Sequence, residues 1–273
     1  MLIKLLKHEF RATGRIMLLI YAAVAALTVL ANVSIRLMDV TNSTVLHILF
    51  GLIIGCFFMG IAAAAAITAV LMIGRFYRSL LGGQGYLMHT LPVTVHHHIW
   101  SKLLVSLVWF AATFLLTWLV ILITVLIQSG TDLGALFAEL PSWSELQRML
   151  AAAGLRASTV TALAFEIFAL VIVCCLVTCL HFYAAMTLGH MFSRSRVLLS
   201  VVFFIAISVL FSILGTGLGR VTDVFASQDL TTSAAFYPAL RRALGIVLGF
   251  QLFHGAVLYI ATALGLKRGL NLA

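Results

Sequence analysis

Six long apolar runs constrain this chain more than any other feature. They lie at about 16–35, 45–73, 103–127, 160–187, 197–218 and 243–266. At 1.5 Å per residue, a helical run of this length crosses a hydrocarbon core of about 30 Å. The runs do not alternate between polar and apolar residues as barrel strands do. With 63% of residues apolar and 9% charged, the sequence predicts an all-α membrane protein with six transmembrane helices.

The charged residues are distributed unevenly between the two sides that these spans define. With the N-terminus inside, the inner segments hold eleven basic residues and one acid, Glu9, whereas the outer segments hold six of each. Such an excess of Lys and Arg marks the cytosolic side. The bias therefore predicts a multi-pass protein with both termini in the cytosol. It also attributes the net charge of +9 to topology and to membrane lipids, so nucleic acid is not expected as a partner.

The first fifteen residues read as a separate element before the six-helix domain, 16–273. Leu2, Leu5, Leu6 and Phe10 share one helical face, and the residues around them are basic: Lys4, Lys7 and Arg11. This pattern is typical of a short helix in the membrane interface, with its basic side toward lipid headgroups. The alternative is a plain cytosolic lead-in to the first span.

Residues 74–102 form the longest polar interruption in the first half of the chain. They carry Arg75, Arg78 and Lys102 and no acid, so we expect the loop to be cytosolic. Between the glycines at 82–85 and Pro92 stands the apolar cluster Tyr86-Leu87-Met88. An exposed cluster of this kind is unusual unless something covers it. The loop is therefore interpreted as a docking surface for a separate energy-supplying subunit; the alternative is that it folds back onto the inner end of the helices.

The outer segment 128–159 contains a predicted amphipathic helix at 143–153. Ser142 with Glu145 three residues later forms a capping box. Leu146, Met149 and Leu150 then fall on one face. We expect this helix to lie on the membrane or to cap the bundle.

Polar residues within the apolar runs give a second candidate site. Glu166 is the acid inside a span, and an intramembrane carboxylate is costly enough to be a functional hypothesis. Gln251 and His254 lie three residues apart on one face of the sixth run. A pairing of Glu166 with His254 across the bundle is one hypothesis, and a satisfied polar packing contact is the other. His181 is expected at the inner membrane boundary.

Motifs for catalysis or metal binding are missing from the sequence. It contains no GxxxxGK[ST], HExxH or GxSxG pattern, and no acidic cluster that would hold a metal ion. His96, His97 and His98 are consecutive and would point in different directions on a helix. The chain is therefore not expected to be an enzyme, to bind ATP itself or to hold a metal.

Two stretches resemble the membrane subunits of type-2 ATP-binding-cassette (ABC) transporters, especially small permeases of Gram-positive bacteria. They are KHEFRATGR, from Lys7 to Arg15, and RFYRSLLGGQGYLMHTLPVT, from Arg75 to Thr94, followed by SKLL at 101–104. The first is similar to the elbow helix of that family, here with Lys4, Lys7, Phe10 and Arg11. The second is similar to its coupling helix between spans two and three. The coupling residues that the resemblance implies are Gly85, Tyr86, Leu87, Met88, Thr90, Leu91 and Pro92.

The resemblance implies a permease subunit of an ATP-driven exporter in the bacterial plasma membrane. Two protomers, identical or different, would form the translocation path, and separate ATPase subunits would bind ATP and Mg²⁺. The sequence leaves two other functions open. One is a proton-coupled secondary transporter that uses Glu166 and His254. The other is a membrane anchor or sensor subunit that transports nothing.

Overall fold

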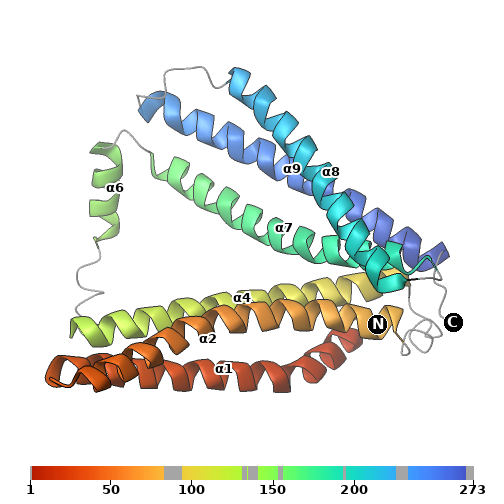
Figure 1. Ribbon diagram of the computed structural model, residues 1–273. Helices are drawn as coiled ribbons and strands as arrows, with labels where there is room; N and C mark the ends of the chain where they lie inside the picture. The colour runs from red at the N-terminus through yellow and green to blue at the C-terminus, as the bar shows by residue number, and fades with distance from the viewer. Residues whose placement is uncertain are drawn as a thin grey trace. The chain divides into compact units, whose positions relative to one another are not determined.

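The computed structural model describes residues 2–82, 94–130, 134, 141–152, 156–192, 195–225 and 233–268, and every regular element in these ranges is helical. Within these ranges, six helices are long and apolar enough to cross a membrane. In chain order they are α1 (Leu2–Val40), α2 (Thr44–Phe76), α4 (Val95–Ser129), α7 (Ala157–Gly189), α8 (Arg196–Phe225) and α9 (Ser233–Arg268) (Figure 1). They confirm the prediction of an all-α fold with six apolar helices and indicate a multi-pass membrane protein.

Most of these helices extend beyond the apolar runs from which they were predicted. The second continues past α2 into the π-helix η1 (Tyr77–Leu81), so that Thr44–Leu81 is helical over 38 residues. At 1.5 Å per residue this is about 57 Å, well beyond a hydrocarbon thickness of about 30 Å. The polar residues Arg75 and Arg78 end the apolar run but do not break a helix. The backbone leaves the helical conformation at Gly82, whose N–H donates to the carbonyl of Tyr77 at 2.8 Å.

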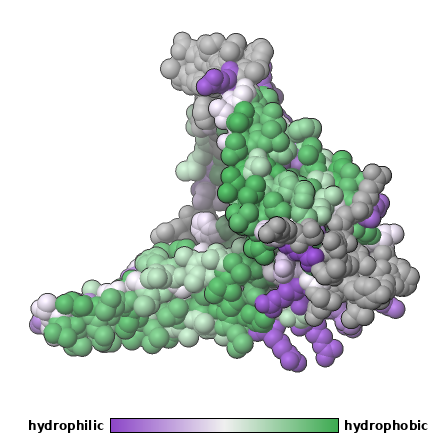
Figure 2. All heavy atoms as spheres, turned by 45° about the vertical axis from the view of Figure 1, so that its right-hand side comes forward, coloured by the Kyte–Doolittle hydropathy of each residue, from purple (hydrophilic) through white to green (hydrophobic). Residues whose placement is uncertain are grey.

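Residues 1–75 and 104–140 form one compact unit, which contains α1 and most of α2 and α4. Its core joins the three helices through Val24 and Ala31 of α1, Phe57 and Ala64 of α2, and Val120 of α4, all buried. Outside this core, large apolar side chains on the long helices are exposed, as lipid-facing residues are. The hydrophobic colour that runs along the helices in Figure 2 shows this surface.

The expected elbow does not appear as a separate element, because α1 is continuous from Leu2 to Val40. The exposed side chains in its first turns include Lys4, Lys7 and Arg11. Phe10 packs against Trp109 of α4, with ring centroids 6.0 Å apart. Part of the apolar face predicted for an interfacial helix is therefore used for packing inside the protein.

Polar side chains join α1 to α4 along the length of this unit, and we call them the α1/α4 seam. Trp109 Nε1–H donates to Thr13 Oγ1 at 2.9 Å. One turn further, the hydroxyl groups of Tyr21 and Thr113 are 2.9 Å apart. Near the opposite end, Asn32 Nδ2–H donates to Thr124 Oγ1 at 3.1 Å. Interhelical hydrogen bonds of this kind help to hold membrane helices together, since the hydrophobic effect is absent between apolar faces in lipid.

Residues 76–103 and 141–273 form the second unit, in which α7 packs along both α8 and α9. The approach of α7 to α8 is close at Gly189. A Cβ atom there would lie 2.7 Å from the Cα of Ser200. Real Cβ atoms do not come so near to backbone, so this crossing requires the missing side chain of glycine.

The predicted amphipathic helix is present as α6 (Trp143–Ala152), and its capping box is formed. The backbone N–H of Ser142 donates to Glu145 Oε2 at 2.7 Å, and the backbone N–H of Glu145 donates to Ser142 Oγ at 3.3 Å. Two residues three positions apart carry this signal, which is why the sequence alone could predict it.

Candidate functional site

The predicted coupling residues, Gly85 to Pro92, lie outside the described part of the chain. The residues on either side of them are described, and we call residues 76–82 and 94–103 the loop base. Both halves of the loop base belong to the second unit. Their contacts define how the chain on either side of these residues is attached to the long helices.

The first half of the loop base is attached to α7 through two ring contacts. Phe76 is fully buried and stacks on Tyr183, with ring centroids 3.8 Å apart and an interplanar angle of 7°. Tyr77, in η1, meets His190 edge to face at 5.3 Å. Leu80 and Leu81 are also buried. The chain therefore enters the loop from a well-packed position on α7.

The second half of the loop base is attached to α9. The Nδ1 atom of His96 and the hydroxyl oxygen of Tyr259 are hydrogen-bonded at 2.6 Å, and their rings are stacked at 5.7 Å. Trp100 lies against the same tyrosine, with ring centroids 6.2 Å apart. Ser101 and Lys102 are buried. One end of the loop is thus fixed to α7 and the other to α9.

The three consecutive histidines have three different surroundings. His96 binds Tyr259, whereas His97 is hydrogen-bonded to Thr94 Oγ1 and His98 is buried. They do not converge on one point, as expected for neighbouring positions on a helix. Among the described residues, no group of three or more His, Cys, Asp or Glu side chains is placed to hold a metal ion.

Glu166 does not pair with His254 as hypothesised. Arg241 of α9 donates from Nη2 and Nε to Glu166 Oε1 at 2.7 and 3.0 Å. Arg241 precedes the apolar run at 243–266, but it lies inside the helix because α9 begins at Ser233. His254 is thirteen residues further along α9, which is about 20 Å along a helix axis. The carboxylate therefore lies at the level of Arg241 and far from the histidine.

His254 instead belongs to a buried cluster between α7, α8 and α9. Its ring stacks on Phe211 at 3.6 Å and lies 5.7 Å from His181. The Nε2 atom of His181 in turn lies 3.1 Å from the hydroxyl oxygen of Ser208. His181, which was expected at the membrane boundary, therefore contacts a specific residue of α8. Within the described ranges, His254 Nε2, Gln251 Oε1 and Glu166 Oε2 are buried without a hydrogen-bond partner. Gln251 and His254 could therefore accept a bound water or a polar ligand group.

Tyr183 and Tyr259 contact the loop base but were not predicted as site residues from the sequence. Both lie within apolar runs and had no signal beyond being aromatic. Comparisons of the chain with protein-family models, with curated proteins and with solved structures found no match. Its function is therefore inferred from its residues and their contacts.

Proposed function

We propose that the chain is the permease subunit of an ATP-driven exporter of the ABC type. Separate ATPase subunits would dock on the cytosolic loop between α2 and α4, at Gly85, Tyr86, Leu87, Met88, Thr90, Leu91 and Pro92. The observation that supports this proposal most strongly is the loop base, which attaches the loop to two different transmembrane helices.

A docking loop can drive transport only if its displacement is passed on to the membrane helices. Packed protein interiors resist compression and transmit strain. A push on the loop would reach α7 through the stacked rings of Phe76 and Tyr183. The same push would reach α9 through His96, Trp100 and Tyr259. The loop base thus has the contacts that a mechanical connection requires.

The remaining parts of the proposal concern partners. ATP and Mg²⁺ would be bound by the ATPase subunits, since the chain has no phosphate-binding loop. A second permease protomer would complete the path for the substrate. The exposed basic residues at the start of α1, Lys4, Lys7 and Arg11, would face anionic lipid headgroups.

The proton-coupled alternative is less well supported. It required Glu166 and His254 to act together, and the carboxylate is instead bound to Arg241. An intramembrane carboxylate paired with arginine is already compensated. The anchor or sensor alternative uses the same loop as the permease, so experiment must distinguish the two.

The first test is co-purification of the tagged protein from its native membrane. We expect an ATPase subunit to be recovered with the unaltered protein and to be lost with Tyr86→Ala or Leu87→Ala. The matched control is Phe168→Ala, since this side chain is also an apolar ring but is exposed on α7. Recovery of no ATPase with the unaltered protein would overturn the proposal.

The second test separates a permease from an anchor. A single cysteine at Val247, in α9, is labelled in the purified complex with and without ATP and vanadate. We expect the nucleotide to change the labelling rate, and we expect Tyr183→Leu to abolish this change while the ATPase still co-purifies. A complex whose labelling never responds to nucleotide would be an anchored assembly and not a transporter.

A further inference from the structure

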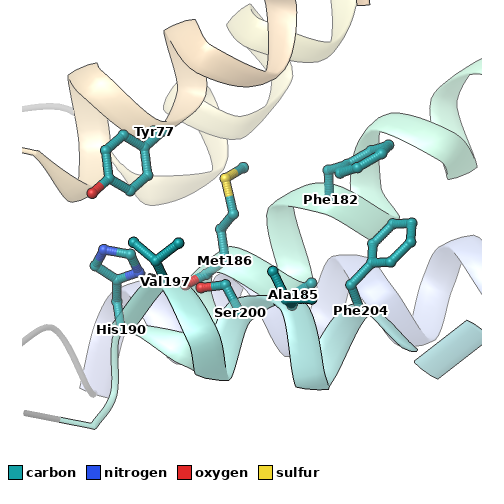
Figure 3. Close-up of a pocket in the computed structure, with 9 residues that line it drawn as sticks. Tyr77, Phe182, Ala185, Met186, His190, Val197, Ser200 and Phe204 are labelled. Atoms are coloured by element: carbon teal, nitrogen blue, oxygen red, sulfur yellow. Dashed lines mark hydrogen bonds between the residues drawn. The ribbon is translucent and has the colours of Figure 1, made fainter. Parts of the chain in front are cut away.

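A cavity of about 460 Å³ lies between α7 and α8. Its volume is within the roughly 300–1,000 Å³ typical of small-molecule sites. Tyr77 of η1 covers it, and α7 and α8 supply the walls, including Phe182, Met186, His190, Ser200 and Phe204 (Figure 3). All of these residues belong to the second unit.

The two ends of this cavity differ in chemistry. Tyr77 and His190 lie at one end, and Phe182 and Phe204 lie at the other (Figure 3). The two phenyl rings are stacked at 4.7 Å. Between the ends the lining is mainly apolar, with Met186 and Ala185 from α7 and Val201 from α8. The cavity is therefore an apolar slot with polar groups at one end.

The position of the cavity along the helices matches the inner half of a membrane. His190 follows the last residue of α7, and Val197 is the second residue of α8. Phe204 is eight residues into α8, which places the apolar end about 12 Å further along the helix axis. The positive-inside bias puts this end of α7 and α8 on the cytosolic side. The slot thus runs from the inner headgroup region into the hydrocarbon.

The slot is also open to lipid, and two basic residues adjoin its lining residues in the chain. Val197 and Val201 line it and are 68% and 53% exposed. Arg78 directly follows Tyr77 in the chain, and Arg196 directly precedes Val197. Both arginines are therefore sequence neighbours of lining residues at the polar end. Basic residues beside an intramembrane groove on the cytosolic side attract anionic lipid headgroups.

We propose that this slot binds one acyl chain of an anionic phospholipid from the inner leaflet. The chain would lie between α7 and α8 with its apolar part against Met186 and the two phenyl rings. The headgroup phosphate would be bound near Arg78 and Arg196, and the hydroxyl of Tyr77 could donate to a glycerol ester. This site does not depend on the proposed transport function, since it requires neither an ATPase nor a second protomer.

The test uses the full chain in lipid nanodiscs made of phosphatidylcholine with a minor fraction of phosphatidylglycerol. The phosphatidylglycerol carries a diazirine in the middle of one acyl chain, and cross-linked peptides are mapped by mass spectrometry after irradiation. We expect cross-links concentrated in 182–190 and 197–204. Unlabelled phosphatidylglycerol should reduce them severalfold, whereas phosphatidylcholine with the same acyl chains should not.

Three variants and one control make the assignment specific. Val201→Trp fills the slot and should reduce these cross-links severalfold. Val202→Trp adds the same side chain at the next residue of α8, which is 50% exposed and is not part of the lining, and should leave them unchanged. Met186→Phe fills the slot from α7 and replaces the first variant should that one not fold. Arg78→Gln should remove the preference for phosphatidylglycerol.

Three results would overturn the proposal. Equally dense cross-links at Val209 and Ile213, which are exposed further along α8, would show only the general lipid layer around the protein. Cross-links unaffected by either slot-filling variant would show the same. Equal competition by phosphatidylcholine would refute an anionic headgroup site.

Discussion

At the scale of single residues, Glu9 is an acid among several basic residues at the start of α1, and it forms an ion pair with Arg75. Arg75 of α2 donates to Glu9 Oε2 from Nη2 at 2.7 Å and from Nε at 3.3 Å. Glu9 is buried, and a buried carboxylate needs such a partner. The pair explains why one acid is tolerated among so many cations, and it fixes α1 to α2.

We expect Glu9→Gln to destabilise the protein by on the order of 1 kcal/mol, because the charge of one partner is lost and the arginine is partly exposed to solvent screening. Thermal unfolding in detergent, followed by tryptophan fluorescence, measures the change. Lys7→Gln, an exposed position in the same helix, should leave the midpoint unchanged. Equal effects of the two substitutions would argue against the ion pair.

Glu166 has a partner that only the three-dimensional structure shows. Because this carboxylate lies in an apolar run, the sequence predicts that it needs a polar partner. Its partner could not be predicted, because Arg241 precedes the apolar run at 243–266 and is expected outside that span. A helix that begins ten residues earlier than its apolar run moves an arginine into reach. Charge and hydropathy indicate where a span must be, and they leave its helical extension undetermined.

At the scale of helices, the crossing of α7 and α8 depends on Gly189. We expect Gly189→Ala to destabilise the protein by about 1–3 kcal/mol, since the added methyl group would overpack against the backbone of Ser200. Gly245→Ala in α9 is the matched control, because nothing lies within 4 Å of its added Cβ. It should be neutral or stabilising by about 0.5–1 kcal/mol. Thermal unfolding of the two variants measures whether each substitution stabilises or destabilises the protein. An unchanged unfolding midpoint for Gly189→Ala would contradict the close approach of α7 to α8.

The start of α6 should depend on pH. The backbone N–H of Ser142, and then its hydroxyl, bind the ionised carboxylate and lower the pKa of Glu145. A lowered pKa means that the carboxylate stabilises the helix above the pKa of the unfolded segment, and that this contribution is lost as pH falls through the folded value. Hydrogen-exchange protection in 143–152, corrected for intrinsic rates, should therefore fall in acid. Glu145→Gln should remove this dependence, and an identical pH profile in that variant would refute it.

Features that depend on neighbouring residues could be predicted from the sequence, whereas contacts between residues far apart in the chain could not. The capping box of α6 spans four residues, 142–145, and the six apolar runs are continuous, so both could be predicted from the sequence. The stacking of Phe76 on Tyr183 joins residues from different helices. Nothing in the neighbourhood of either residue specifies the other. The contacts of the loop base could therefore not be predicted from the sequence.

At the scale of the whole molecule, the topology predicted from the charge bias, with both termini in the cytosol, would place Lys4 and α6 on opposite sides of the membrane. We expect a cysteine at Gln147, exposed in α6, to react with a membrane-impermeant maleimide in intact cells. A cysteine at Lys4 should react only after permeabilisation. The four natural cysteines give the background, which is measured in the unaltered protein. Reaction of Lys4→Cys in intact cells would refute this topology.

The α1/α4 seam has a consequence for the timing of biosynthesis. The partners in the Tyr21–Thr113 and Asn32–Thr124 hydrogen bonds are each 92 residues apart in the chain. A ribosome adding about 5–20 residues per second needs roughly 5 to 18 seconds to bridge that interval. During it, the hydroxyl of Tyr21 has emerged without the α4 partner that it binds in the finished protein. Until α4 is made, α1 therefore lacks the interhelical hydrogen bonds that join it to α4 in the finished protein.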